Sequence, residues 1–145
     1  MIVAEKVIRS DSAGDGRFGA RRGSRTHRGV DYVCKPGELV YSPVSGVVSK
    51  LGFPYGDDLR WRYVEIRDDD KNRHRLFYCR PAVVKHQIVS KGEVVAEADD
   101  VTERYPNQGM TPHIHYELID SMGEYIDPEE FWNERSGSSG ASNSA

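Results

Sequence analysis

The stretch Met110-Thr-Pro-His-Ile-His-Tyr-Glu-Leu-Ile119 predicts a β-strand whose two faces have different chemistry. Side chains at positions i and i+2 of a strand point to the same face of the sheet. His113, His115 and Glu117 are therefore expected to share one face, while the apolar and aromatic residues between them occupy the other. On the histidine face, one side chain can bind a metal while its neighbour faces a substrate.

A second histidine motif lies far upstream, in Thr26-His-Arg-Gly-Val-Asp31. His27 and Asp31 are four residues apart, with a glycine between them. Two neutral imidazoles and one carboxylate form a three-ligand zinc site whose fourth position stays open, which is typical of catalytic rather than structural zinc. A lone His-x-His pair is usually an ordinary surface or core pair, but the two motifs together indicate a metal site.

The rest of the chain reads as short strands separated by turns. Apolar or alternating runs predict strands at residues 1–9, 39–41, 46–51, 61–67 and 74–80. Turn signals lie at residues 36–37, 68–72 and 91–92. Asp127 followed by Pro128 predicts the N-cap and the first turn of a short C-terminal helix. We therefore expect an all-β or β-dominated fold with one short C-terminal helix.

The composition suits one small globular domain. The 145 residues carry a net charge of -3 and are 37% hydrophobic, so nothing indicates a nucleic-acid-binding surface. No apolar run approaches the roughly 20 residues of a membrane span, and the N-terminus does not resemble a signal peptide. Residues 1–134 are expected to form a single domain, and the Ser/Gly-rich residues 135–145 a flexible tail.

Two features leave alternatives open at this point. The Gly-rich segment 10–25 contains four arginines, namely Arg17, Arg21, Arg22 and Arg25. They could attract an anionic substrate or belong to a solvated loop. Cys34 and Cys79 are too few for a disulfide framework, and they either form one bridge or are two small buried residues.

Several motifs occur in the order and spacing of the lysostaphin-type zinc endopeptidases, which cut peptide cross-links in bacterial cell walls. They are His27-x-Gly-x-Asp31, Pro36-Gly-x-x-Val40-Tyr-x-Pro with Gly46-x-Val48, Val89-x-Lys-Gly92-x-Val94 and His113-x-His115-x-Glu117. The chain resembles this family from about residue 17 to about residue 119. Within it, the chain is similar to small phage-type wall peptidases and to the leukocyte cell-derived chemotaxin branch, which is regarded as a non-peptidase. The resemblance implies an antiparallel β-sheet core with a groove walled by loops.

The resemblance also implies a ligand set and a base. His27, Asp31 and His115 would hold one zinc ion per chain. His113 would lie beside the metal and act as general base, because a neutral imidazole can accept a proton from water. A structural role for His113 is the alternative.

The chain departs from the family pattern at one catalytic position. The family's second catalytic histidine lies in a Tyr-x-His pattern, and Tyr78-Cys-Arg80 stands in its place. A guanidinium can stabilise an oxyanion as a fixed cation, but it cannot act as a base at neutral pH. Arg80 is therefore a candidate catalytic residue, and Tyr78 and Tyr105 are expected to bind substrate.

Two functions follow from the resemblance. The first is a zinc-dependent peptidoglycan endopeptidase in a phage virion, associated with other tail proteins and opening the host wall. The second is a catalytically degenerate zinc-binding module with a structural or wall-binding role in such an assembly, which the replacement at Arg80 favours. A cytoplasmic metallopeptidase acting on unrelated peptides is a third hypothesis.

Overall fold

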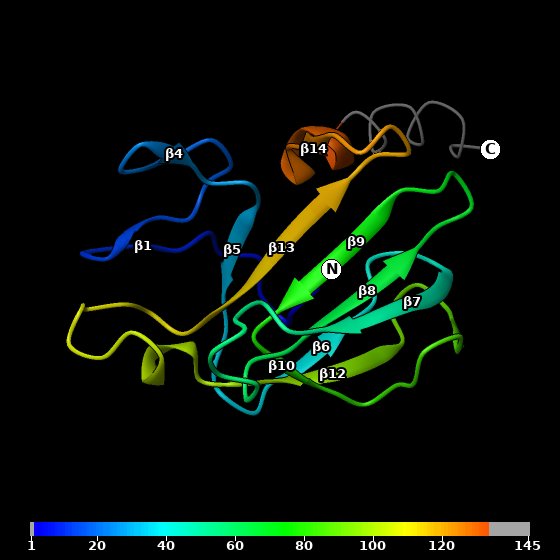
Figure 1. Cartoon of the computed structure of the whole chain (residues 1–145), viewed down its shortest axis with the longest axis horizontal. Helices are drawn as coiled ribbons and strands as arrows, with labels where there is room; N and C mark the ends of the chain where they lie inside the picture. Colours follow the sequence, from blue (N-terminus) through cyan, green and yellow to red (C-terminus); the bar gives the residue numbers. More distant parts are fainter. Residues whose placement is uncertain (1, 134–145) are drawn as a thin grey trace.

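The computed structural model describes residues 2–133 and consists mainly of antiparallel β-sheets (Figure 1). Within this range, a 3-10 helix spans Val101–Glu103 and residues 128–133 form a short helix near the C-terminus. The β-dominated prediction is therefore confirmed. The predicted tail at residues 135–145 lies outside the described residues. Among residues 2–133, no helix combines the length and apolar character needed to cross a membrane.

A seven-stranded antiparallel sheet forms the larger layer. Its strands in spatial order are β11 (Ile88–Val89), β7 (Gly46–Gly52), β8 (Tyr63–Arg67), β9 (Arg73–Phe77), β13 (His113–Ile119) and β14 (Tyr125–Ile126), with β5 (Val30–Val33) also paired to β13. β13 thus pairs with β9 along one side, and with β5 and β14 in succession along the other.

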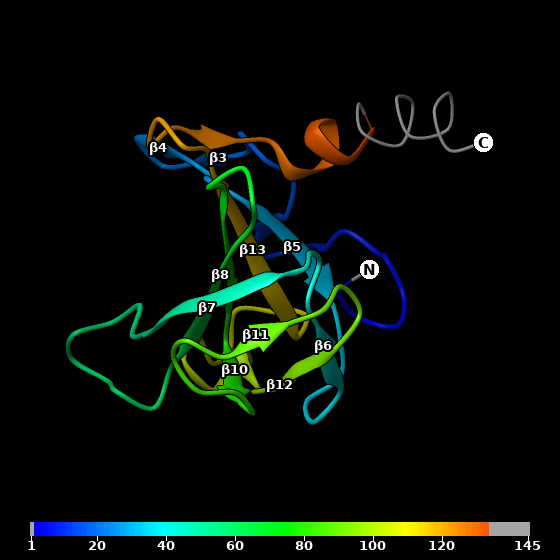
Figure 2. The ribbon, with the colours of Figure 1, turned by 90° about the vertical axis from the view of Figure 1, so that its right-hand side faces the viewer.

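Three smaller sheets complete the strand inventory of the described residues. One has three strands, in the order β10 (Cys79–Pro81), β12 (Val94–Ala98) and β6 (Leu39–Tyr41). Two short hairpins are formed by β1 (Ser10–Asp11) with β2 (Gly14–Asp15), and by β3 (Arg21–Arg22) with β4 (Arg25–Thr26). Figure 2 shows the β3–β4 hairpin at the opposite end of the molecule from the three-stranded sheet.

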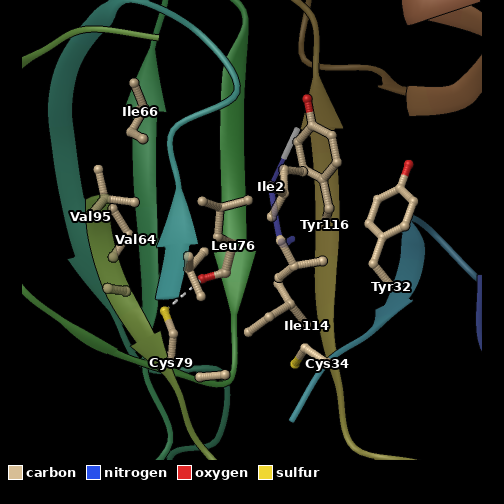
Figure 3. Close-up of a cluster of buried hydrophobic side chains, with 14 of the residues drawn as sticks. Ile2, Tyr32, Cys34, Val64, Ile66, Leu76, Cys79, Val95, Ile114 and Tyr116 are labelled. Carbon is tan, nitrogen blue, oxygen red and sulfur yellow. Dashed lines mark hydrogen bonds between the residues drawn. The ribbon is translucent and has the colours of Figure 1, made fainter. Parts of the chain in front are cut away.

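The core contains the apolar face of β13. Ile114 and Tyr116 are fully buried, and they belong to one cluster with Leu76 of β9 and Val64 of β8 (Figure 3). Val95 joins the same cluster from the three-stranded sheet, so the two sheets share one core. Each such side chain contributes roughly 1.5–3 kcal/mol by leaving water. The strand predicted around the two histidines is confirmed, with Ile114, Tyr116 and Leu118 in the core, and His113 and His115 on the other face are buried as well.

The two cysteines are buried in this core and are not bonded to each other. Burial raises the pKa of both thiols to about 12, so they remain protonated at neutral pH. Of the two alternatives, the structure supports small buried residues rather than a bridge.

Two predicted strands differ from the structure. Residues 2–9 form no strand and contribute one isolated bridge, between Ile8 and Tyr32. The strand predicted over residues 74–80 is interrupted at Tyr78, where φ is +72°. The interruption is a β-bulge, in which the backbone N–H groups of Tyr78 and Cys79 both donate to the carbonyl of Arg62, at 2.9 and 3.4 Å. As a result, β9 stays in the large sheet while β10 joins the small one.

Gly29 allows the segment between β4 and β5 to cross tightly over β13. A Cβ at this position would lie 2.2 Å from the carbonyl oxygen of Tyr116 and 2.9 Å from Cε1 of His115. Both distances are too short for any side chain. The glycine in the His-x-Gly-x-Asp motif is therefore a steric requirement for bringing this segment against β13.

Replacing Gly29 with alanine should destabilise the protein, because backbone rather than a flexible side chain blocks the new methyl group. We expect a loss of about 1–3 kcal/mol in the free energy of unfolding, as for other overpacked sites. Gly56→Ala is the matched control, since a Cβ there meets nothing within 4 Å. Urea unfolding should leave this control within about 0.5 kcal/mol of the wild type. Equal midpoints for the two variants would contradict the steric argument.

Candidate metal centre

The register between β5 and β13 brings the two histidine motifs together. His115 of β13 lies directly opposite Asp31 of β5 and, on its other side, opposite Phe77 of β9. Residues paired across antiparallel strands point to the same face. The carboxylate of Asp31 and the imidazole of His115 therefore meet on the face of the sheet that points away from the core.

Three potential ligand atoms converge at this point. Oδ1 of Asp31 lies 2.8 Å from Nδ1 of His115 and 3.2 Å from Nε2 of His27, and the two imidazole nitrogens are 3.1 Å apart. Ligands about 2.0–2.1 Å from a tetrahedral zinc lie roughly 3.3 Å from one another. The spacing of the three atoms is thus close to what a zinc ion requires, as expected from the sequence.

Neighbouring groups direct the lone pairs of both imidazoles toward the same point. Nδ1 of His27 lies 3.1 Å from the carbonyl oxygen of Arg17, and Nε2 of His115 lies 3.0 Å from Oε1 of Glu117. Carbonyl and carboxylate oxygens only accept hydrogen bonds, so each of these ring nitrogens carries a proton. The opposite nitrogens are left to bind a metal, and the donor set fits zinc.

The carboxylates set the protonation of this cluster when no metal is bound. Burial opposes ionisation of Asp31, but hydrogen bonds from His115 and His27 keep its pKa well below the usual range. Burial would lower the pKa of His115, yet Asp31 and Glu117 outweigh burial and raise it to about 9. At neutral pH, the metal-free cluster therefore holds a proton on His115 next to an ionised Asp31.

His113 lies beside the three converging residues and differs from them in protonation. Its Nδ1 donates to the carbonyl oxygen of Thr111 at 2.8 Å, so its Nε2 is the basic nitrogen. That nitrogen is 3.7 Å from Oδ2 of Asp31. Burial lowers the pKa of His113, and the negative charge of Asp31 does not reverse the shift. The side chain is therefore a neutral base at neutral pH.

A groove of about 720 Å³ runs across this face of the sheet. One side is cationic and is lined by Arg22, Arg25 and Arg28. The other side is aromatic and is lined by Phe53, Tyr55, Tyr78 and Tyr105. His27, Asp31, His113 and His115 line the same groove.

The two tyrosines expected to bind substrate both lie in the groove and are joined by a third. The hydroxyl of Tyr78 is 3.0 Å from that of Tyr55, which also makes a very short hydrogen bond to the hydroxyl of Tyr105. The ring of Tyr78 packs edge-on against His113, with 5.8 Å between ring centroids. Tyr78 thus connects the aromatic side of the groove to the basic histidine.

The structure does not bring Arg80 into the groove. After the bulge at Tyr78, Arg80 belongs to β10 of the three-stranded sheet. Its guanidinium pairs with Asp99 at 3.3 Å and with Glu97 at 3.4 Å, and it is not among the groove-lining residues. The bulge at Tyr78, which the alternating pattern did not indicate, accounts for this placement.

The remaining histidines of the chain also lie elsewhere. His74 is fully buried and contacts Asp68 and the hydroxyl of Tyr116 at 2.9 and 2.7 Å. His86 is exposed in the turn before β11. Among the described residues, His113 is therefore the one histidine that the groove holds besides the two candidate ligands.

Arg9 also belongs to the site, although no sequence motif indicated it. Its side chain is 3% exposed, and its Nη2 lies 3.0 Å from Oδ2 of Asp31. In the sequence Val7-Ile-Arg-Ser10 it reads as the end of an apolar run, and no short motif distinguishes it. The sequence offered one indication of this residue, a charged side chain at the end of an apolar segment. Such side chains are common at strand ends.

The metal-free protein should lose stability as the pH rises from 6.5 to 9. The pKa of His115 is about 9 in the folded state against an ordinary value of 6.5. The proton therefore stabilises the fold fully below pH 6.5, and that stabilisation is lost as the pH passes 9. Urea unfolding with a chelator present measures this directly.

Two controls isolate the contribution of His115. Glu117→Gln should reduce the pH-dependent loss, because it removes one of the two carboxylates that retain the proton. Saturating zinc should reverse the trend, since metal and proton compete for the same lone pair. A Glu117→Gln variant with the same pH profile as the wild type would contradict the assignment.

Comparison with known proteins agrees with this geometry. A model of peptidase family M23 matches residues 25–128. Leukocyte cell-derived chemotaxin-2 of Mus musculus is 33% identical over 123 residues, covering 81% of this chain and 76% of the relative.

Two solved structures share the fold. The first is a mutant of the catalytic domain of the prophage-encoded M23 protein EnpA from Enterococcus faecalis, with a TM-score of 0.63, 21% identity, and coverage of 87% of this chain and 91% of that one. The second is the catalytic domain of the antimicrobial peptidase lysostaphin from Staphylococcus simulans, with a TM-score of 0.62, 20% identity, and coverage of 84% and 90%. By its match to the family model and to this relative, the chain belongs to peptidase family M23.

Proposed function

We propose that this chain is a zinc-dependent endopeptidase that cuts peptide cross-links of peptidoglycan. One observation carries the proposal: His27, Asp31 and His115 converge in a single groove, and the basic nitrogen of His113 lies beside them. A three-ligand site with a neighbouring neutral base is the arrangement that hydrolysis of a peptide bond requires.

The roles of the residues follow from their contacts. Zinc held by His27, Asp31 and His115 would supply a Lewis acid that polarises the scissile carbonyl and makes water more acidic. His113 would accept the proton of the attacking water at Nε2, because its Nδ1–H is already held by the carbonyl of Thr111. The same nitrogen could then return the proton to the leaving amine.

Tyr78 is the residue best placed to donate a hydrogen bond to the developing oxyanion. Its side chain lines the groove with the ring against His113 and the hydroxyl next to that of Tyr55, whereas the guanidinium of Arg80 pairs with Asp99. Burial and the neighbouring Tyr55 keep the pKa of Tyr78 well above its ordinary value. The hydroxyl therefore remains a neutral donor over the whole working pH range, as a fixed oxyanion donor must.

The charge of the groove favours an anionic peptide. Arg25 and Arg28 line the cationic side, and neither forms an ion pair within the described residues. A peptide with free carboxylates, such as those of a bacterial wall, would supply the missing negative charge. Its apolar atoms could lie against Phe53 and Tyr105 on the opposite side. This arrangement supports the anionic-substrate alternative for the arginine-rich segment.

The proposed setting is a phage particle, in which the domain opens the host wall as a tail-associated component together with other tail proteins. The motif resemblance to phage-type wall peptidases and the prophage origin of one structural relative support this setting. Immunogold labelling of intact virions would test it, with label on the tail as the expected result. Virions without label would instead favour the alternative, a cytoplasmic location.

A second candidate function is a zinc-binding module that does not hydrolyse peptides. The 33% identity to a chemotaxin favours it, as does the absence of a second basic histidine from the groove of the described residues. Digestion of purified peptidoglycan with zinc-loaded protein separates the two functions. New free amino groups, detected by mass spectrometry of the released muropeptides, support the peptidase. No products from a protein that holds one zinc per chain would support the binding module.

Variants of the ligands and of the base should separate metal binding from hydrolysis. His27→Ala and Asp31→Asn should lose both zinc and hydrolysis, because each removes one of three ligands. His113→Ala should retain zinc and lose about 10²–10⁴-fold in hydrolysis rate, the usual contribution of a general base. His86→Asn is the control, since this exposed histidine lies outside the groove. Zinc-independent hydrolysis by His27→Ala would exclude the mechanism.

Tyr78→Phe and Arg80→Gln distinguish the two candidates for oxyanion stabilisation. We expect Tyr78→Phe to lower the rate by about 10²-fold or more, as for other oxyanion donors. Arg80→Gln should stay within about twofold of the wild type, because its partners Asp99 and Glu97 lie outside the groove. Steady-state hydrolysis of a defined cross-linked muropeptide gives both numbers. A large loss in Arg80→Gln with no change in Tyr78→Phe would reverse the assignment.

A further inference from the structure

The N-terminal brace, defined here as residues 9–16, packs against the metal centre although it precedes the family-matched residues 25–128. The backbone N–H of Arg9 donates to the carbonyl of Asp31 at 2.9 Å, and that of Asp31 donates to the carbonyl of Gly16 at 2.8 Å. A Cβ on Gly16 would lie 2.9 Å from the carbonyl oxygen of Arg9 and 2.9 Å from Cβ of Asp31. The brace is therefore fitted closely to the backbone of one candidate ligand.

The side chain of Arg9 reaches the carboxylate of that ligand. Its Nε and Nη2 lie 3.1 and 3.0 Å from Oδ2 of Asp31, while Oδ1 of the same carboxylate faces His27 and His115. Arg9 and Asp31 are 3% and 2% exposed, so water does not compete for these hydrogen bonds. The two oxygens of one carboxylate thus have separate partners.

This division has a consequence for metal binding. A carboxylate can bind a metal through one oxygen or through both. With two N–H donors on Oδ2, Asp31 has Oδ1 alone to offer, and the site keeps one coordination position open. The positive charge of Arg9 also compensates a carboxylate that would otherwise be buried at high cost.

The brace continues from Arg9 to the basic histidine. Nη1 of Arg9 lies 2.8 Å from Oδ1 of Asp11, and Oδ2 of Asp11 accepts from the backbone N–H of Thr111 at 2.7 Å. The carbonyl of the same Thr111 accepts from Nδ1 of His113 at 2.8 Å. One hydrogen-bonded chain therefore joins Asp31 to His113 through Arg9, Asp11 and Thr111.

We propose that Arg9 is a positioning residue that holds Asp31 as a one-oxygen metal ligand, and that Asp11 extends this positioning to His113. The inference rests on the proposed zinc site and adds to it a part of the chain outside the family match. The guanidinium of Arg9 is buried and hydrogen-bonded to Asp31 and Asp11, so it acts on the metal site through Asp31.

Cobalt(II) substitution of the full chain tests the role of Arg9. Arg9→Lys keeps the charge but loses the planar fork that reaches Asp31 and Asp11 together. Oδ2 of Asp31, no longer hydrogen-bonded to Arg9, should then coordinate the metal. The coordination number of the bound cobalt should rise, so its visible absorption should weaken. Zinc affinity should fall by about 10–100-fold, as for other residues that orient ligands.

Arg60→Lys is the matched control. Arg60 also binds a carboxylate through Nε and Nη2, that of Asp99, which is 5% exposed and is not among the groove-lining residues, with Nη2 2.8 Å from Oδ1 and Nε 3.4 Å from Oδ2. We expect Arg60→Lys to keep the wild-type cobalt spectrum and zinc affinity. A merely structural role for Arg9 would lower the unfolding midpoint of the metal-free protein without altering the cobalt spectrum.

Asp11→Asn tests the hydrogen bonds that lead from Asp11 through Thr111 to His113. This test does not require the Arg9→Lys variant to fold. Asparagine offers one acceptor oxygen where Asp11 uses two, so the link to Thr111 should loosen. The ring ¹⁵N shifts of His113 should then report a mixture of tautomers in place of the Nδ1–H form.

The outcomes separate this inference from the proposed function. A wild-type cobalt spectrum in Arg9→Lys, or an unchanged tautomer in Asp11→Asn, would overturn the corresponding half of the inference. Altered spectra in a protein that never hydrolyses peptidoglycan would support the brace and overturn the peptidase. A wild-type chain that binds neither cobalt nor zinc would overturn both.

Discussion

The pairing of β5 with β13 is the interaction on which the rest of the site depends. It places Asp31 directly opposite His115 and leaves both on the face of the sheet that is turned away from the core. A shift of one residue in this register would turn one of the two side chains into the apolar layer. The buried face of β13, with Ile114 and Tyr116, resists such a shift, because it would move these side chains out of the core.

Tight backbone contacts bring the other groups to this pair. Gly29 lets the segment carrying His27 lie against β13, and Gly16 lets the N-terminal brace lie against Asp31. Both glycines are needed for close approach, and neither has a positive φ. The centre therefore consists of three segments, residues 9–16, 27–31 and 113–117. The last belongs to β13, and the close contacts at the two glycines hold the other two in place.

Electrostatic interactions give His115 and His113 different protonation states. His115 lies between two carboxylates, Asp31 and Glu117, and retains a proton until a metal replaces it. His113, two residues earlier on the same face, is held by a carbonyl oxygen and by burial in its neutral form. Two histidines with the same sequence spacing and orientation thus differ in charge because their hydrogen-bond partners differ. Because of that difference, His115 is suited to bind a metal and His113 to transfer a proton.

The sequence by itself determined the β-dominated class, the two faces of residues 113–119 and the candidate ligands His27, Asp31 and His115, because alternation and short motifs are local properties. Only the tertiary structure decided the placement of Arg80 and Arg9. The first depends on the positive φ of Tyr78, at a bulge after which β10 pairs in another sheet. The second depends on a contact between residues 22 positions apart. Periodicity carries no information about either, since both arise from contacts between segments that are distant in the sequence.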